Sequence, residues 1–229
     1  MFGINSYKYI IRNFLKNDFE FSFFSDSFHK KSICLRHDID FSIQDALKIA
    51  IIEDEIGIYS SYFIMISSNT YNPFSEFNFK AIKKIKSLGH KISLHFDPSI
   101  YNDPLSGFKK EKKIFESFFN SNIDLVSIHK PGKFLDNNNR HLNNCEHTYQ
   151  NKYFKDMTYI SDSGGKDIQY KLKNFLSFYK GDTIHLLLHP IWWTQTTKNP
   201  SQTLEYWINN QKVFLTSETK KNVKTFKIQ

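Results

Sequence analysis

Short apolar runs of strand length alternate along the chain with segments in which apolar residues recur at helical spacing. The strand-like runs cover residues 32–38, 59–66, 91–96, 125–128, 157–160 and 183–188. The helical segments cover residues 6–17, about 42–56, 75–88, 107–120 and 201–215. The second helix has Ser42 and Asp45 in capping positions, and Gly57 marks its end. Strands that alternate with helices predict a mostly parallel sheet, either open and doubly wound or closed as a barrel.

The length and composition of the chain fit one folded domain. We expect a single domain over residues 1–229, with 6–17 as an N-terminal covering helix and 201–215 as a closing helix. Hydrophobic residues make up 40% of the sequence and aromatic residues 17%, which argues against disorder. The chain has no secretory leader, no membrane-spanning apolar run and only two cysteines, Cys34 and Cys145. These features predict a cytoplasmic protein without a membrane span.

The formal charge of the chain is +8, which permits an acidic partner. Its lysines are spread among Asn, Ile and Phe over the whole sequence, and only the tail around residues 220–227 resembles a charge run. We attribute the charge to general composition and expect no nucleic-acid partner. A basic metallo-phosphoesterase or nucleic-acid-binding protein is the alternative that the charge motivates.

Ionisable side chains follow five of the predicted strands. The clusters at the strand ends are Asp38 with Asp40, His95 with Asp97, His129, Asp162, and His189. In a parallel α/β architecture the carboxyl ends of the strands lie at one edge, and in a barrel they surround one mouth. The pattern therefore predicts one shared site that contains carboxylates and imidazoles.

The spacing of these residues suggests hydrolytic chemistry. Asp38 and Asp40 lie two residues apart and project to one side of a strand, with Arg36 behind them. Two carboxylates at such a short distance repel each other unless a cation, a proton or an arginine lies between them. An aspartate with imidazole nitrogens suits a divalent metal, with zinc the expected one. Such a metal lowers the pKa of water toward ~7, a free carboxylate takes the proton, and a histidine protonates the leaving group.

The motifs resemble those of the polysaccharide deacetylase family, also called the NodB homology or carbohydrate esterase 4 family, and look closest to divergent members associated with surface-polysaccharide biosynthesis. The resemblance covers roughly residues 32–193. It implies a distorted (β/α) barrel of fewer than eight regular units. It also implies a metal-dependent hydrolase that removes an N-acyl group, usually acetyl, from an amino sugar or polysaccharide precursor.

The family resemblance also implies roles for individual residues. Asp38 matches the catalytic base of the first motif, and Asp40 matches the metal-binding aspartate that follows it. The run 89–95 looks like the second motif, whose final histidine binds metal, so this role falls on His95. His189 matches the histidine of the fifth motif, which assists the leaving group.

Two departures from the family pattern concern the metal and the catalytic aspartate. Ser99 stands where a second metal-binding histidine is usual, and residues 129–132 replace a motif that opens with an arginine. We infer that His129 is the third metal ligand, with Asp97 as the other candidate, and that Arg36 takes over the task of the missing arginine. The competing explanation is that the chain has lost its metal and is an inactive carbohydrate-binding relative.

The supporting residues have two interpretations each. Asp162 falls in the region of the fourth motif, but it can also cap the turn at Gly164 and Gly165. Trp192 and Trp193 offer flat faces to a sugar ring, although core packing is the commoner fate of tryptophan and at most one of them can face the substrate. We select Trp192 as the supporting residue.

Overall fold

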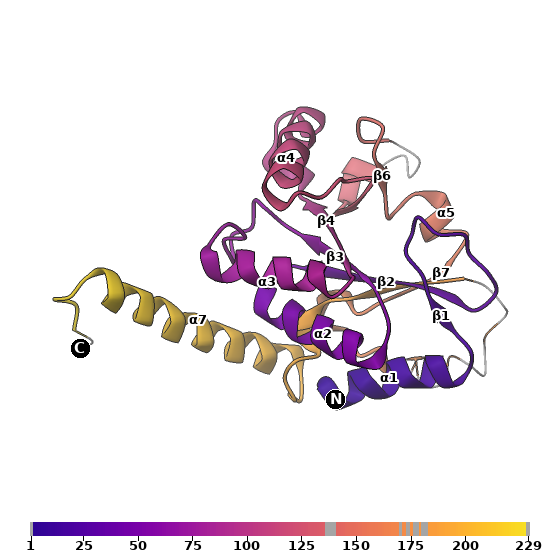
Figure 1. The fold of residues 1–229 in the computed structure, drawn as a ribbon, viewed down its shortest axis with the longest axis horizontal. Coiled ribbons are helices and arrows are strands. Elements are labelled where there is room, and N and C mark those ends of the chain that lie inside the picture. Colours follow the sequence, from indigo (N-terminus) through magenta and orange to yellow (C-terminus); the bar gives the residue numbers. More distant parts are fainter. Residues whose placement is uncertain are drawn as a thin grey trace.

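The computed structural model describes residues 2–135, 141–169, 171–172, 175, 179 and 183–227. Its centre is a sheet of eight strands in which every pairing is parallel (Figure 1). The strands are β1 (Glu20–Phe21), β2 (Ser32–Ile39), β3 (Ser61–Ile64), β4 (Lys91–Phe96), β5 (Leu125–Ile128), β6 (Glu146–His147), β7 (Thr158–Ser161) and β8 (Ile184–Leu188). They follow the order β6-β5-β4-β3-β2-β8-β7, with β1 paired to the start of β2.

The sheet curls into a partial barrel. The Arg36 side chain on β2 donates hydrogen bonds to Ser127 on β5 and to Thr148 just after β6, at 2.6 Å in each case. Because β3 and β4 lie between β2 and β5 in the sheet, these contacts cross the concave interior. The predicted parallel α/β fold with a distorted barrel is therefore confirmed.

Helices surround the sheet. The α-helices are α1 (Ile4–Lys16), α2 (Ile43–Ile56), α3 (Glu76–Ser87), α4 (Pro104–Phe119), α5 (Asn151–Phe154) and α7 (Pro200–Asn222). Short 3₁₀ turns follow several strand ends: η1 (Pro98–Ile100), η2 (Gly132–Leu135), η3 (Ser163–Gly165) and η4 (Pro190–Trp192). In Figure 1, α1, α2 and α3 lie side by side on one face of the sheet. Together they bury a hydrophobic core against β2, β3 and β8.

The caps of α2 follow the predicted chemistry. The Ser42 hydroxyl accepts a hydrogen bond from the backbone N–H of Asp45 at 3.1 Å. The helix ends at Gly57, which has a φ of 85° in the left-handed region that glycine tolerates best. The Ser42 cap fixes where α2 begins, shortly after Asp40, and Gly57 fixes where it ends.

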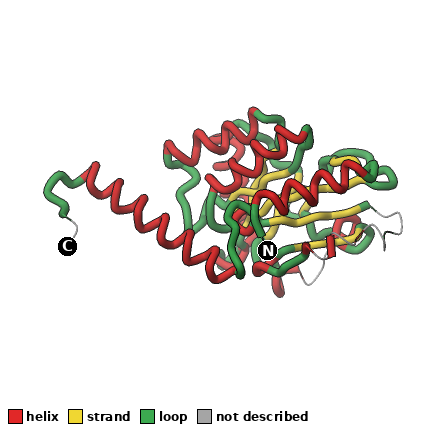
Figure 2. Tube along the Cα trace, turned by 90° about the horizontal axis from the view of Figure 1, so that it is seen from below, coloured by secondary structure: helices red, strands yellow, loops and turns green. Residues whose placement is uncertain are grey.

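The C-terminal helix is longer and less covered than predicted. Instead of ending near residue 215, α7 continues to Asn222 and projects away from the body (Figures 1 and 2). Its first turns pack on the body, where the Trp207 ring meets Phe41 at 5.3 Å. Further along, Ile208 is 55% exposed and Phe214 is 43% exposed. A helical stripe shows which face is apolar, but it cannot show whether another surface covers that face.

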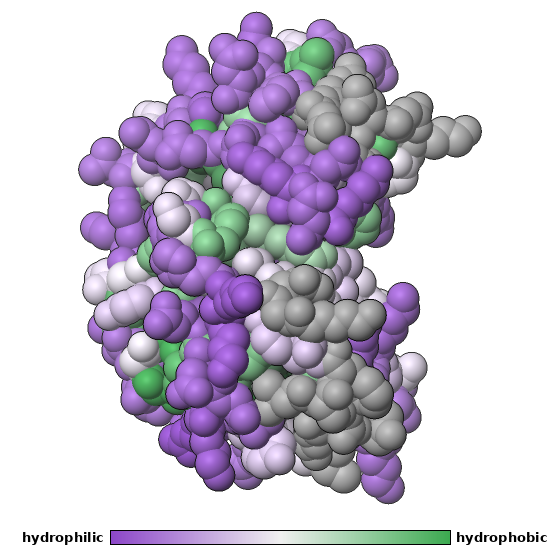
Figure 3. All heavy atoms as spheres, turned by 90° about the vertical axis from the view of Figure 1, so that its right-hand side faces the viewer, coloured by the Kyte–Doolittle hydropathy of each residue, from purple (hydrophilic) through white to green (hydrophobic). Residues whose placement is uncertain are grey.

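The opposite side of the molecule has a different surface. On the face turned away from the end of α7, hydrophilic side chains dominate what is visible (Figure 3). Within the part of the chain that the structure describes, we find no helix with the length and apolarity needed to cross a bilayer.

Candidate active site

The carboxyl ends of β2, β4 and β5 bring Asp40, His95 and His129 together. Asp40 Oδ1 lies 3.2 Å from His95 Nε2 and 3.4 Å from His129 Nδ1. The two imidazole nitrogens are 3.1 Å apart. One potential ligand atom from each residue lies within 4.8 Å of the other two. The three side chains that the sequence predicts as metal ligands therefore converge on one point.

The chemistry of this cluster fits a divalent cation. Asp40 Oδ1 is buried and accepts no hydrogen bond from any described residue, although two imidazole nitrogens face it. Burial alone would raise the pKa of Asp40, but the neighbouring imidazoles of His129 and His95 hold it well below the ordinary range. A buried carboxylate oxygen and two imidazole nitrogens form the mixed oxygen and nitrogen set that zinc and similar cations accept, with room for further ligands.

Asp97, the other candidate for the third ligand, is engaged elsewhere. Its Oδ1 accepts hydrogen bonds from the backbone N–H of Ser99 at 2.9 Å and from the Ser99 hydroxyl at 2.6 Å. Asp97 thereby caps η1 and does not belong to the cluster of Asp40, His95 and His129. Among the described residues, the geometry favours His129 as the third ligand.

Asp38 lies beside the cluster in a rigid ion pair with Arg36. The guanidinium donates from Nε to Asp38 Oδ1 at 2.8 Å and from Nη2 to Oδ2 at 2.6 Å. The Ser127 hydroxyl donates a third hydrogen bond to Oδ2 at 2.9 Å. Although burial raises the pKa of Asp38, the Arg36 charge lowers it far below the ordinary range. Arg36 therefore holds the Asp38 carboxylate in place through both of its oxygens.

Asp162 fixes His189 beside the cluster. Asp162 Oδ1 lies 2.6 Å from His189 Nδ1, and the backbone N–H of His189 donates to the same carboxylate. The Trp193 indole donates to Asp162 Oδ2 at 2.7 Å. These bonds leave His189 Nε2 facing the cluster, 3.7 Å from Asp40 Oδ2. Burial alone would lower the pKa of His189, but the Asp162 carboxylate raises it to about 9.

The two supporting residues, Asp162 and Trp192, have different surroundings. Asp162 makes no side-chain cap at η3, so its contact with His189 is the one that the structure supports. Trp192 is 5% exposed and packs against Phe2 and Phe41, whereas the supporting hydrogen bond comes from its neighbour Trp193. The selection of Trp192 as a substrate-facing or supporting residue thus differs from the structure, since η4 turns the Trp193 indole toward Asp162 instead.

Three side chains that hold the site were not predicted as site residues. Ser127 binds Asp38 and Arg36, Thr148 binds Arg36, and Trp193 binds Asp162. Ser127 could have been predicted, because the alternation of side chains along β5 places it on the same side as His129. Thr148 could not, because β6 is only two residues long and gives no periodic pattern.

Comparisons with known proteins find likenesses among solved structures. No protein-family profile and no curated protein matches the chain. The structure of the peptidoglycan deacetylase PdaC from Bacillus subtilis is similar at 11% identity and a TM-score of 0.47, over 83% of this chain and 96% of that one. The chitin deacetylase of the fungal pathogen Colletotrichum lindemuthianum is similar at 15% identity and a TM-score of 0.47, over 78% and 81%.

A CE4 family pseudoenzyme from Bacillus anthracis is also similar, at 14% identity and a TM-score of 0.45, over 80% of this chain. This chain spans 61% of that protein's length. The matched proteins are of the kind that the sequence motifs resemble.

Proposed function

We propose that this chain is a divergent member of the polysaccharide deacetylase family that hydrolyses the N-acyl group of an amino sugar. The observation that supports this proposal is the arrangement of three sets of side chains around one mouth. Asp40, His95 and His129 form a cation site, Asp38 Oδ2 lies 3.8 Å from His95 Nδ1, and His189 Nε2 lies 3.7 Å from Asp40 Oδ2. A hydrolase needs a fixed carboxylate and a fixed imidazole beside its metal ligands, whereas a relative that only binds sugar needs neither.

A divalent cation bound by Asp40, His95 and His129 would polarise the amide carbonyl and make an attacking water more acidic. Asp38 accepts the proton of that water. A carboxylate offers about four lone-pair positions, and Arg36 and Ser127 occupy three of those on Asp38. The free position is on Oδ1, which we assign as the proton acceptor. Arg36 keeps this oxygen oriented.

His189 supplies the proton that the departing amine requires. Asp162 holds Nδ1 and thereby presents Nε2 to the mouth, so one tautomer and one ring orientation are maintained. When the C–N bond breaks, the acyl group leaves as a carboxylate and the sugar nitrogen leaves as an amine that has gained the proton from His189. The reaction consumes one water.

Elemental analysis of the purified chain tests the cation site. We expect about one equivalent of a divalent metal in the wild type and in Asp97→Asn, because Asp97 only caps η1. We expect His129→Ala to lose roughly 100-fold or more in metal affinity, since it removes one of three protein ligands. Equal metal content in His129→Ala and the wild type would assign the third ligand elsewhere. A wild type without affinity for any divalent cation would instead support the inactive relative.

Acetate release from N-acetylated amino sugars tests the reaction itself. We expect release by the metal-loaded chain, loss of release after chelation and recovery when the metal is restored. Binding of a cation without release from any N-acetylated amino sugar would contradict the proposed activity. Cleavage of a phosphodiester substrate under the same conditions would favour the metallo-phosphoesterase alternative.

A further inference from the structure

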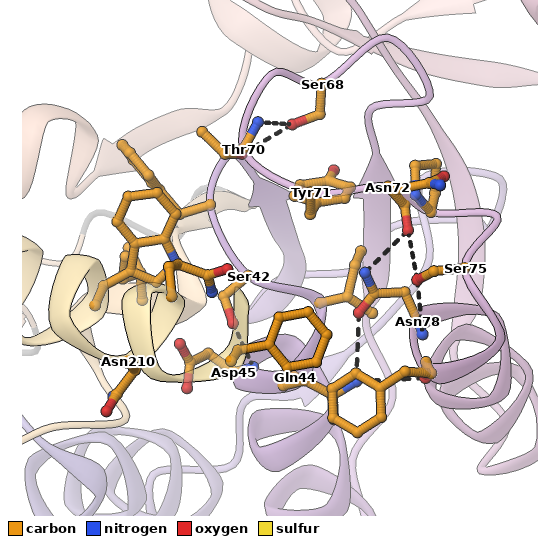
Figure 4. A pocket seen from close by; sticks show the side chains of 18 of the residues that line it. Ser42, Gln44, Asp45, Ser68, Thr70, Tyr71, Asn72, Ser75, Asn78 and Asn210 are labelled. Carbon is orange, nitrogen blue, oxygen red and sulfur yellow. Dashed lines mark hydrogen bonds between the residues drawn. The ribbon is translucent and has the colours of Figure 1, made fainter. Parts of the chain in front are cut away.

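The projecting helix α7 has an inner side that is turned toward the rest of its own chain. On this side the Phe214 ring stacks on Phe77, at the start of α3, with 6.0 Å between the ring centres. Figure 4 shows Asn210 of α7 across a cleft from Ser42 and Asn78, which lie at the starts of α2 and α3. The inner side of α7 therefore already has a surface opposite it.

A second, shallow groove of about 460 Å³ runs along the other side of α7, and we call it the outer groove. Its lining comes from α7 itself and from Phe226 in the tail, with no residue of the α/β body. Two apolar residues of this lining are strongly exposed, Ile208 at 55% and Leu215 at 60%. Because the helix projects from the body (Figures 1 and 2), the chain itself leaves these side chains in water.

The residues of the outer groove follow the spacing of a helix–helix interface. Leu204, Ile208, Gln211 and Leu215 recur at alternating intervals of four and three residues. This is the spacing with which one helix packs along another. Leu204 packs partly against the body, whereas the other three line the outer groove. A single polar residue in such a seam, here Gln211, typically fixes the register of the two helices.

Two exposed charges flank this seam on one side. Glu205 and Lys212 are seven residues apart, which is about two helical turns, so they lie on the same flank. Neither forms an ion pair or a hydrogen bond with another described residue. By contrast, Glu218 and Lys221 further along α7 pair with each other at 2.6 Å. The flank beside the seam thus carries one anion and one cation without partners in the described part of the chain.

We infer that the outer groove binds a second copy of this chain, with the two α7 helices antiparallel along the seam. In a twofold antiparallel pair, equivalent flanks of the two seams lie beside each other and run in opposite directions. Glu205 then lies beside the partner's Lys212, and Lys212 lies beside the partner's Glu205. This self-complementary pattern of charge favours a second copy over an unrelated protein.

The position of α7 on the body also favours the antiparallel arrangement. Each body lies at the beginning of its α7, so an antiparallel pair places the two bodies at opposite ends of the helices (Figure 1). A parallel pair would bring both bodies to the same end. It would also place Glu205 and Lys212 beside the flank that carries Trp207 and Phe214, which offers no opposite charge.

The size of the interface sets the strength that we expect. A helix of 23 residues is about 34 Å long and about 10 Å wide, so an α7 pair buries on the order of 1,000 Å² in total. This area lies at the lower limit of specific interfaces. We therefore expect a reversible dimer with a dissociation constant on the order of 10 µM.

Sedimentation equilibrium of the full-length chain, from about 1 to 200 µM, tests the inference. Leu215→Lys places a charge in the seam, and we expect it to raise the dissociation constant at least about 100-fold, because the substitution enters the interface twice. Val213→Lys is the matched control. Val213 is 69% exposed, lies on the opposite side of the helix and lines neither the outer groove nor the cleft. We expect this control to dimerise like the wild type.

Exchange of the two flanking charges tests the antiparallel pairing itself. Glu205→Lys and Lys212→Glu each place like charges next to each other in the dimer, and we expect each to raise the dissociation constant about 10-fold. With both substitutions in one chain, the opposite charges meet again with their signs exchanged. We therefore expect the double variant to dimerise within a few-fold of the wild type.

Four results would overturn the inference. One is a wild type that stays monomeric over the whole concentration range, and another is equal weakening by Leu215→Lys and Val213→Lys. A third is a double charge variant that dimerises no better than the single variants. The fourth is a monomer that binds anionic lipid vesicles through Leu215, since a membrane surface would then cover the outer groove. The inference goes beyond the proposed function, and absence of acetate release would leave it unchanged.

Discussion

Replacing Asp38 with Asn is expected to reduce turnover by about 10³-fold, the usual scale for loss of a general base. The substitution keeps the size of the side chain and leaves Asp40, His95 and His129 untouched. The variant should therefore retain its bound cation. Acetate release from an N-acetylated amino sugar, measured beside metal content, checks both halves of this expectation. Turnover within a few-fold of the wild type would refute the role of Asp38.

The buried ion pair makes stability a necessary control for this experiment. Asn cannot neutralise Arg36, whose side chain is fully buried, so the fold should lose about 3–5 kcal/mol. Ser127→Ala offers a comparison, because it removes one hydrogen bond to Asp38 but keeps the ion pair. We expect it to reduce turnover about 10-fold or less. If Asp38→Asn does not fold, adding Arg36→Met removes the unpaired charge and allows the same assay.

The local elements and the edge of the sheet were predictable from the sequence, because each follows from periodicity or capping. The cap at Ser42 and the stop at Gly57 set the bounds of α2. Asp40, His95 and His129 each follow the end of a predicted strand, and in a parallel sheet all strand ends lie at the same edge. The closeness of these three residues depends on the direction of the strands and on where they end, and both can be inferred from the sequence.

Other parts of the site depend on distances that no local pattern expresses. Nothing in the sequence distinguishes Trp193, which binds Asp162, from Trp192, which packs in the core, because η4 decides which indole turns inward. Thr148 reaches Arg36 only because the sheet curls. Similarly, Glu53 lies in the Glu-rich end of α2, where a solvent-exposed position would be the ordinary reading, yet its side chain is fully buried.

Glu53 is the centre of a buried polar network on the outer face of the sheet. Its Oε1 lies 2.8 Å from His37 Nε2 and also accepts a hydrogen bond from the Tyr7 hydroxyl. Its Oε2 accepts hydrogen bonds from the hydroxyls of Ser60 at 2.7 Å and Tyr62 at 2.5 Å. His37 Nδ1 in turn lies 3.2 Å from the carbonyl oxygen of Leu188 on β8. The carboxylate thus joins α1, α2, β2 and β3.

Replacing Glu53 with Gln should therefore destabilise the fold by about 3–5 kcal/mol. Both carboxylate oxygens face donors, so the NH₂ group of Gln must face either His37 and Tyr7 or Ser60 and Tyr62. Urea unfolding measures the loss. Glu55→Gln is the matched control on the same helix: Glu55 is exposed and forms a long ion pair with Lys8 at 3.4 Å, so we expect a change below about 0.5 kcal/mol. Similar losses in both variants would contradict the role of the network.

The stability difference between wild type and Glu53→Gln should also depend on pH. Burial alone would raise the pKa of Glu53, but His37 and the hydroxyl donors lower it to about 2, against an unfolded value of about 4.3. The stabilisation is therefore complete above about pH 4.3 and lost as pH falls toward 2. Asp38 and Asp40 also have lowered pKa values, but they titrate in both proteins and cancel in the difference. A difference that stays constant from pH 6 down to about pH 2 would mean that the Glu53 charge contributes nothing to folding.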